Sequence, residues 1–470
     1  MAYPRSYSFS AKMSESPSEG SHVLMLPYLA KGHLKPFTAL ARMLADRTSF
    51  KITLISTPLN VHILRSFLPP DTPICFAELP FCSTDHGLPP GVENTSAAPP
   101  HLVRHLLPAS GSLRPAFERL VRDTSTRREG RPPLCLITDG LMGWTVEIAK
   151  ELGCQHYTFV IVGAYGIGRW TEMAENGLSS NESSIHTAIA YVLKQLCFSK
   201  ESNGVLFNTV EELEAQALEI HRRKNWKRVW AIGPVLSPPP PSSASSLVLQ
   251  WLDQHPKTSV LYVAFGSEVG THPHQMMEIA KGLEASGKSF IWVIRPPIGH
   301  FDMKLNDDED DFRSVEWLPA GFQERVTKQK NQGLLVKKWA PQFEILSHQS
   351  TAAFFTHCGW NSVLETLSNG VPVIGWPLAY DHPRNSRFME EELGVGVEVA
   401  RGTEAEIRGL EVERVIRLVM DRDSEKGAEM RRKAKRIKEE IIVAATVDEG
   451  TIKGSSIRAM EDFIQAMKQP

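Results

Sequence analysis

Short apolar runs alternate along most of the chain with stretches in which apolar residues recur at helical spacing. The apolar runs lie at 22–27, 51–56, 134–138, 156–162, 260–265, 290–295, 334–337, 352–356 and 371–376. Helical spacing follows several of them, through Leu40 and Leu44 and across 142–152, 274–285 and 362–368. Apolar runs that alternate with helices are typical of parallel sheets covered on both faces. The pattern therefore predicts an α/β fold.

A segment rich in proline and serine divides this pattern into two halves. Residues 237–248 begin with Ser-Pro-Pro-Pro-Pro-Ser-Ser, a composition that favours an extended linker and cannot form a packed core. We expect an N-terminal domain at 21–236 and a C-terminal domain at 249–450, each with its own parallel sheet. Residues 1–20 are rich in serine, lack the apolar core of a secretion signal and are predicted to form a disordered leader.

Composition and charge are those of an ordinary globular protein. The 470 residues include 42% hydrophobic and 23% charged residues, and 52 Lys+Arg against 54 Asp+Glu leave a formal charge of −2. This balance argues against nucleic acid or an anionic membrane as a partner, and no apolar run reaches the roughly 18 residues of a spanning helix. The six cysteines lie far apart without a CxxC pair, which favours a reducing compartment such as the cytoplasm.

Two side chains that could act together follow predicted strands. His33 comes after the run at 22–27, beside the start of a helix, and Asp139 directly follows the run at 134–138. Ligands of open α/β sheets bind beyond the carboxyl ends of the strands, so these positions come first for function. If the two strands are neighbours, Asp139 could orient His33 as a general base. The alternatives are a surface histidine and an aspartate that caps the next helix.

A second candidate site lies where a buried strand leads into a helix. The segment Thr356-His-Cys-Gly-Trp-Asn-Ser362 places Gly359, Asn361 and Ser362 at the start of that helix. Free N–H groups and the helix dipole favour an anion there. Ser362 and Glu365 also fit a capping box, which would give both residues a purely structural role.

Three further sequence features bear on which ligands and cofactors the protein could bind. Ser267 follows the run at 260–265 and could also approach a ligand. No G-x-G-x-x-G fingerprint follows any predicted strand, which disfavours a nicotinamide or flavin enzyme. The acidic run Asp307-Asp-Glu-Asp-Asp311 could hold a divalent cation, but clustered like charges usually form a solvated loop. We predict neither a metal site nor a cofactor.

The 44 residues from Trp339 to His382 resemble the signature box of the plant family 1 UDP-glycosyltransferases. The matching positions are Trp339-Ala-Pro-Gln342, His357-Cys-Gly-Trp-Asn-Ser362, Glu365, Gly370-Val-Pro372 and Trp376-Pro377. Outside the box, segments in the family's order are Gly32-His33, Gly204-Val-Leu-Phe-Asn-Thr-Val-Glu-Glu-Leu-Glu214, Ile232-Gly-Pro234 and Phe265-Gly-Ser267. The likeness covers roughly residues 20 to 465.

The resemblance implies a GT-B fold, in which two Rossmann-like, doubly wound domains face each other across a cleft. The N-terminal domain is expected to bind a small-molecule acceptor and the C-terminal domain a UDP-sugar. A C-terminal helix within 451–470 is expected to pack back on the N-terminal domain.

The resemblance also assigns roles to individual residues. His33 matches the family's general base and Asp139 its partner. Trp339 is expected to stack on uracil, with Ala340 beside it in the donor site. Gln342 and Glu365 are expected to contact the ribose. The residues expected to hold the diphosphate are Ser267, His357, Asn361 and Ser362. Those expected to face the sugar are Trp360, Asp381 and His382.

The implied activity is the inverting transfer of a sugar from a UDP-sugar to a hydroxyl of a small lipophilic plant metabolite, such as a flavonoid, another phenolic or a terpenoid. The enzyme is expected to be a cytoplasmic monomer that needs no cofactor. His382 stands where glucose-using members usually have Gln, and a His there resembles members that use galactose or arabinose. The donor is therefore left open between these sugars. A sugar-nucleotide-binding protein without turnover is the alternative, which the presence of His33 disfavours.

Overall fold

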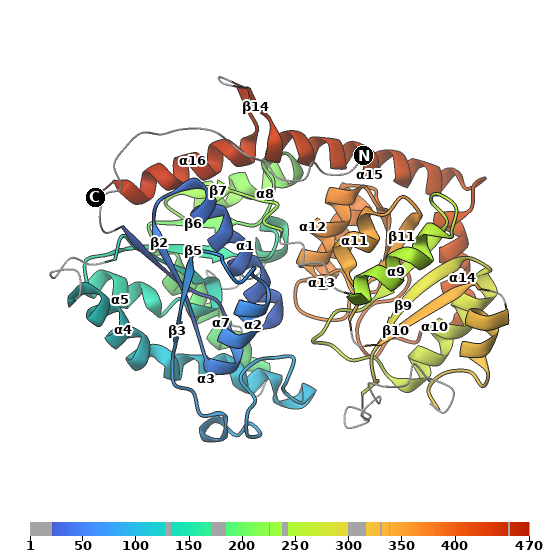
Figure 1. The fold of residues 1–470 in the computed structure, drawn as a ribbon, viewed down its shortest axis with the longest axis horizontal. Helices are drawn as coiled ribbons and strands as arrows, with labels where there is room; N and C mark the ends of the chain where they lie inside the picture. The colour runs from blue at the N-terminus through green and yellow to red at the C-terminus, as the bar shows by residue number, and fades with distance from the viewer. Residues whose placement is uncertain are drawn as a thin grey trace.

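The protein consists of two α/β domains that lie side by side, with two C-terminal helices, joined by a short hairpin, running along the same side of both (Figure 1). The computed structural model describes residues 21–126, 133–168, 170, 185–224, 226–236, 243–298, 316–329, 331–337, 339–449 and 452–469. In these ranges no helix combines the length and the apolar character that crossing a membrane requires.

Seven parallel strands form the N-terminal sheet in the described part of the chain, in the order β3-β2-β1-β4-β5-β6-β7. The strands are β1 His22–Leu26, β2 Lys51–Ser56, β3 Ile74–Glu78, β4 Cys135–Asp139, β5 Gln155–Val160, β6 Gly204–Phe207 and β7 Val229–Ala231. The helices are α1 Lys31–Arg47, α2 Pro58–Ser66, α3 Leu106–Ala109, α4 Arg114–Thr126, α5 Thr145–Glu151, α7 Ile185–Ser199 and α8 Glu211–Lys224. The strand order reverses between β1 and β4, and ligands of doubly wound sheets bind at such a switch point.

The C-terminal sheet has six parallel strands among the described residues, in the order β10-β9-β8-β11-β12-β13. The strands are β8 Val260–Ala264, β9 Ser289–Ile294, β10 Gly333–Lys337, β11 Thr351–Thr356, β12 Val373–Gly375 and β13 Gly396–Glu398. The helices are α9 Ser243–Asp253, α10 Pro273–Ser286, α11 Gln342–Ser347, α12 Trp360–Asn369, α13 His382–Arg387 and α14 Gly409–Met420. Here the switch point lies between β8 and β11.

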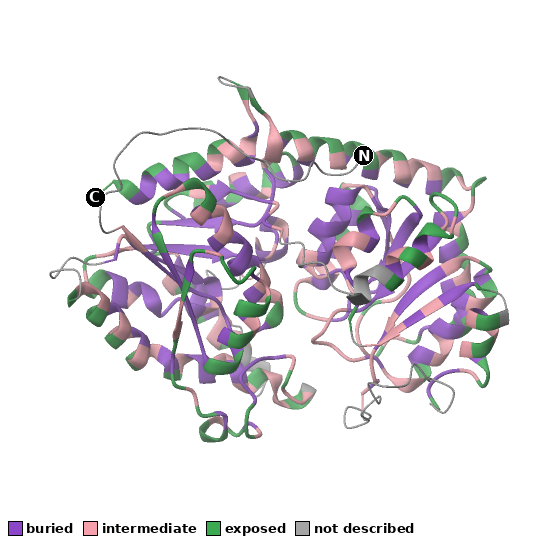
Figure 2. Cartoon of the chain, in the orientation of Figure 1, coloured by how far each residue is buried: buried purple, intermediate pink, exposed green. Residues whose placement is uncertain are grey.

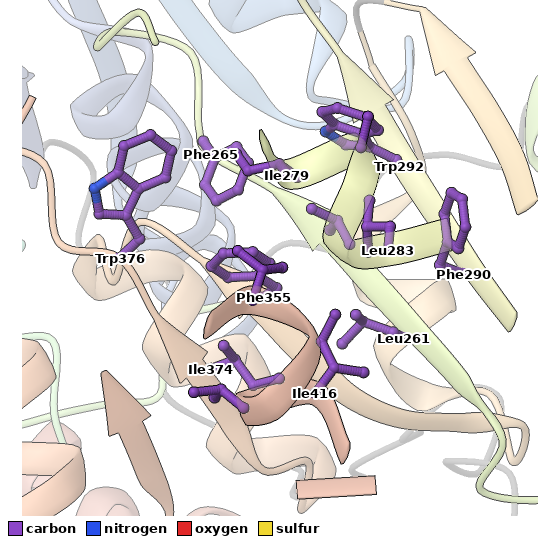
Figure 3. Close-up of a cluster of buried hydrophobic side chains, with 14 of the residues drawn as sticks. Leu261, Phe265, Ile279, Leu283, Phe290, Trp292, Phe355, Ile374, Trp376 and Ile416 are labelled. Carbon is purple, nitrogen blue, oxygen red and sulfur yellow. The ribbon is translucent and has the colours of Figure 1, made fainter. Parts of the chain in front are cut away.

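Helices cover both sheets, so the strands are buried while the outer helix faces are exposed (Figure 2). In the C-terminal domain, large side chains of the strands pack against α10 and α14, among them Leu261, Trp292 and Phe355 (Figure 3). Phe265, just past β8, stands edge-on to Trp376 with ring centroids 5.3 Å apart. Because close-packed cores are rigid, this packing fixes where the segments after β8 and β12 leave the sheet.

The C-terminal helices tie the two domains together. α15 (Glu425–Thr446) contacts α12 of one domain and α8 of the other. A short hairpin of β14 (Asp448–Glu449) and β15 (Ile452–Lys453) leads to α16 (Ser455–Lys468), which packs against β7. Met460, Phe463 and Met467 of α16 belong to the same buried cluster as the core of the N-terminal domain. Burial of each such side chain contributes roughly 1.5–3 kcal/mol relative to exposure, so α16 is an integral part of that domain.

The two parallel α/β units agree with the fold class predicted from the sequence, and each predicted strand is observed within two residues of its predicted bounds. The predicted linker at 237–248 is too long, because α9 already begins at Ser243. Val248 and Leu252 lie one helical turn apart and are buried, which gives this segment a packed face. The predicted leader at 1–20 and the acidic run at 307–311 lie outside the described residues.

Candidate active site between the domains

His33 and Asp139 meet at the switch point of the N-terminal sheet. β1 and β4 are neighbours, with Leu26 beside Thr138, so the segments that follow both strands leave the sheet at the same edge. The His33 Nδ1 and the Asp139 Oδ2 are 2.7 Å apart. His33 lies in the first turn of α1 rather than in the loop before it, because the helix already begins at Lys31.

Asp139 makes both of the contacts that the sequence suggested for it. Its Oδ1 accepts a hydrogen bond from the Leu141 N–H at 2.9 Å and caps the short turn Gly140–Met142, while its Oδ2 accepts from His33. A carboxylate can only accept, so Nδ1 of His33 carries a proton and Nε2 of the neutral ring has the free lone pair. The cap holds the carboxylate, and the carboxylate in turn orients the imidazole.

The charges around His33 favour its protonated form. Burial alone would lower the pKa of His33. The charge and hydrogen bond of Asp139, followed by the charges of Glu268 and Asp381, outweigh this effect, so the pKa of His33 lies above its ordinary value. The ring of Tyr28 stands edge-on, 5.2 Å from the imidazole. His33 is therefore a stronger base than a histidine in water.

The start of α12 forms a helix N-terminus at the end of β11. Gly359 is its N-cap, none of the described side chains caps it, and Cys358 before it has a left-handed φ of 66°. The first-turn N–H groups of a helix have no intrahelical partner and favour an anion. A Cβ added to Gly359 or to Gly266 would lie 2.6 Å from the Nε2 of His357. Glycine at both positions therefore lets the His357 ring pack beside the helix start.

Glu365 of α12 receives hydrogen bonds from both domains. Its Oε2 accepts from the Gln342 Nε2 at 2.8 Å, and its Oε1 accepts from the Lys35 Nζ of α1 at 2.6 Å. The Gln342 Nε2 also donates to the Ser362 Oγ at 3.1 Å. The capping-box interpretation of Ser362 and Glu365 is wrong, because α12 begins at Trp360, two residues before Ser362.

Two residues at the start of α12 contact the N-terminal domain. The Asn361 Nδ2 donates to the carbonyl oxygen of Gly32 at 2.7 Å. The indole of Trp360 is buried and donates from Nε1 to the carbonyl oxygen of Asn208 at 2.7 Å. The contact between the domains therefore takes up the Trp360 ring, and that Trp360 faces the sugar stays a prediction. Its backbone N–H stays in the first turn of the helix.

Asp381 and His382 lie at the start of α13, beside His357. The Asn385 Nδ2 donates to the Asp381 Oδ2 at 2.7 Å, and burial raises the pKa of Asp381. The His382 Nδ1 accepts from the Ala379 N–H at 3.2 Å, and its ring stands edge-on to that of His357 with centroids 4.7 Å apart. Burial lowers the pKa of His382 to about 3, so the ring is neutral and its Nε2 carries the proton.

The remaining predicted donor-site residues follow β8 and β10. Ser267 comes three residues after the end of β8 and is partly buried. Trp339 comes two residues after β10 and exposes half of its surface, while Ala340 beside it is buried. An exposed indole at this edge of the sheet is available for stacking on a planar ligand.

Lys35 and Glu268 also reach the site, although no motif in the sequence points to either of them. Lys35 bonds to Glu365 as described above, and the Glu268 Oε1 accepts from the Thr95 Oγ1 of the N-terminal domain at 2.9 Å. Only their positions could have indicated them, because Lys35 comes two residues after His33 and Glu268 directly follows Ser267.

Known protein sequences resemble this chain along nearly its whole length. Residues 19–237 match the family described as glycosyltransferase, N-terminal domain, and residues 242–434 match the family described as UDP-glucoronosyl and UDP-glucosyl transferase. UDP-glycosyltransferase 92A1 of Arabidopsis thaliana is 39% identical, over 97% of this chain and 99% of that protein. Crocetin glucosyltransferase 3 of Crocus sativus is 36% identical, over 87% of this chain and 92% of that protein.

Solved structures share the same arrangement of two domains. Phytolacca americana UGT2, complexed with UDP-2fluoro-glucose and pterostilbene, matches with a TM-score of 0.76 and 25% identity, over 96% of this chain and 100% of that chain. Glycyrrhiza uralensis UGT73P12, complexed with glycyrrhetinic acid 3-O-monoglucuronide, matches with a TM-score of 0.77 and 25% identity, over 96% of both chains. The chain has the GT-B fold and belongs to the plant family 1 UDP-glycosyltransferases.

Proposed function

We propose that this chain is an inverting transferase that moves a sugar from a UDP-sugar to a hydroxyl of a small lipophilic plant metabolite, with His33 as the general base. The observation that carries the proposal is the 2.7 Å contact between His33 and Asp139. This pair lies where α1 meets the start of α12 through the bond from Asn361 to Gly32. A base from one domain and an anion site from the other therefore come together where acceptor and nucleotide would react.

The proposed reaction is a single displacement at the anomeric carbon. Nε2 of His33 takes the proton of the acceptor hydroxyl while that oxygen forms a bond to the anomeric carbon. The bond from this carbon to the phosphate oxygen breaks, and UDP leaves with the electron pair. Asp139 orients the imidazole and stabilises the imidazolium until the proton passes to solvent. Attack opposite the leaving group inverts the configuration of the sugar.

The departing diphosphate gains negative charge, which donors from the C-terminal domain would stabilise. The N–H groups at the start of α12 and the side chains of Ser267, Asn361 and Ser362 supply hydrogen-bond donors there. Burial is the largest cause that lowers the pKa of His357 well below its ordinary value. His357 therefore takes part as a neutral donor. We propose that no metal ion is needed for this step.

The nucleoside part of the donor would lie between β10 and α12. We propose that the exposed indole of Trp339, with Ala340 beside it, covers the uracil ring. The ribose hydroxyls would bond to Gln342 and to the carboxylate of Glu365, which already meet at 2.8 Å. Asp381, which accepts from Asn385, would accept from the sugar hydroxyls.

The identity of the transferred sugar is a further part of the proposal. Crocetin glucosyltransferase 3 and zeatin O-glucosyltransferase of Phaseolus lunatus, which is 32% identical over 94% of this chain, support glucose. His382 supports galactose or arabinose, because a His at this position resembles members that use these sugars and its Nε2–H is a single donor in place of an amide that both donates and accepts. We propose glucose as one accepted donor and UDP-galactose or UDP-arabinose as another.

The acceptor is proposed to be a lipophilic hydroxyl compound of the phenolic, flavonoid or terpenoid class. Pterostilbene and glycyrrhetinic acid 3-O-monoglucuronide, bound in the two structural neighbours, support this range. A panel of such acceptors assayed against UDP-glucose, UDP-galactose and UDP-arabinose, with products identified by mass and by the anomeric coupling in NMR, tests the proposal. Product of inverted configuration supports it, while UDP binding without any product would favour the non-catalytic alternative.

A further inference from the structure

Tyr380 has a backbone conformation that its bulky side chain disfavours. Its φ is 57°, in the left-handed region that non-glycine residues seldom adopt and aromatic residues least of all. Residues held in this conformation cluster at active sites and ligand contacts. Tyr380 comes directly before Asp381 and His382, at the start of α13.

The packing of the Tyr380 ring does not account for this strain. Its side chain is 56% exposed, so it is not part of a buried cluster. Its closest ring contact among the described residues is with His382, edge-on at 5.8 Å between centroids. A strained residue whose ring gains little from the folded protein is expected to gain from a ligand.

Tyr380 lies at the end of the site that contains the proposed base His33. Tyr28 of the N-terminal domain stands 5.2 Å from His33. The surrounding protein atoms, followed by the charge of Glu268, raise the pKa of the Tyr28 hydroxyl and that of Tyr380, the latter to about 12. The Glu268 Oε1 accepts from the Thr95 Oγ1 at 2.9 Å and would lie 3.8 Å from a Cβ added to Gly32, the residue before His33. Tyr380 reaches the same end of the site from the other domain, next to Asp381 and with its ring edge-on to that of His382.

We propose that Tyr380 determines acceptor specificity, by placing its exposed ring against a planar aromatic acceptor whose hydroxyl points to Nε2 of His33. The inference rests on the proposed function and adds the acceptor class and the residue that selects it. An aromatic ring favours a flat π-system through stacked or edge-to-face contact, which a saturated ring cannot match. A phenol should therefore be preferred over an alicyclic alcohol of similar size.

The test compares two acceptors in wild type and Tyr380→Ala. For a hydroxycoumarin we expect KM to rise about tenfold in the variant, the size of one lost aromatic contact. For a saturated bicyclic alcohol we expect less than a twofold change. The KM for the UDP-sugar and the Kd for UDP should stay unchanged. Tyr380→Phe should keep the hydroxycoumarin KM within about twofold of wild type, because the ring is retained.

The strained backbone of Tyr380 allows a variant that separates loss of the ring from loss of stability. Tyr380→Gly should have a Tm no lower than wild type while it raises the hydroxycoumarin KM, since glycine adopts φ of 57° freely. Thr258→Gly, at φ of 55° in an exposed turn, is the matched variant and should leave both KM values unchanged. A lower Tm in Tyr380→Gly, an equal KM change for both acceptors, or a change confined to the UDP-sugar would overturn the inference. A wild type that binds UDP but glycosylates no acceptor would instead overturn the proposed function.

Discussion

The Nζ of Lys35 lies 2.6 Å from the Oε1 of Glu365, and the two residues come from different domains. The Glu365 side chain is 3% exposed and that of Lys35 32%. The pair therefore joins α1, which carries His33, to the carboxylate that is proposed to hold the ribose. A ribose hydroxyl that approaches this oxygen must share it with the ammonium group or displace it.

This contact separates two contributions to UDP binding. Glu365→Gln should weaken UDP binding by about 1.5–3 kcal/mol, typical of a hydrogen bond to a charged group. Lys35→Met removes the ion pair but keeps the carboxylate, so the Kd for UDP should not rise. Calorimetry on both variants measures the difference, with Glu411→Gln as a control at an exposed pair. If UDP affinity fell equally in the two variants of the pair, the interdomain contact rather than the carboxylate would be what binds UDP.

Gly266 tests how closely His357 packs against the diphosphate site. Its φ is 76°, and a Cβ would lie 2.6 Å from the His357 Nε2. Gly402 has a φ of 87° with nothing within 4 Å of the added Cβ, so Gly402→Ala isolates the backbone cost of about 1–2 kcal/mol. Gly266→Ala should lose roughly 1–3 kcal/mol more, as expected of an overpacked site, and should also weaken UDP binding. Urea unfolding and calorimetry give both values, and equal losses at the two glycines would argue against the close packing.

The pH dependence of transfer should depend on Asp139. The base must be neutral, so kcat/KM falls as the pH drops through the pKa of His33, which Asp139 raises. Asp139→Asn removes that charge, and the acid limb should move to lower pH while the rate falls. Asn can still cap the turn at Leu141, so the fold should survive. An acid limb at the same pH in both enzymes would show that another group titrates.

Donor preference should depend on His382. Its neutral Nε2–H is one donor, whereas a glutamine amide offers a donor and an acceptor. His382→Gln should shift the ratio of kcat/KM values toward UDP-glucose relative to UDP-galactose and UDP-arabinose. Competition assays with paired donors measure this ratio, and His274→Gln at an exposed histidine is the control. A wild type already strict for glucose would exclude this role.

Part of this site could be predicted from the sequence because it depends on local pattern. One apolar run ends six residues before His33 and another directly before Asp139, and the neighbouring positions of β1 and β4 then bring the two residues together. The pair of Lys35 and Glu365 could not be predicted, because 330 residues and the docking of two domains separate its members. The same docking brings the Trp360 indole against the carbonyl oxygen of Asn208, 152 positions away along the chain, and this contact could not be predicted either.

The central claim is that His33 removes the acceptor proton while the other domain binds the nucleotide. His33→Ala, measured for product formation and for UDP binding by calorimetry on the same preparation, tests it most directly. We predict that transfer falls at least about a hundredfold, the usual contribution of a general base, while the Kd for UDP stays within about twofold of wild type. Product formation near the wild-type rate would contradict the account.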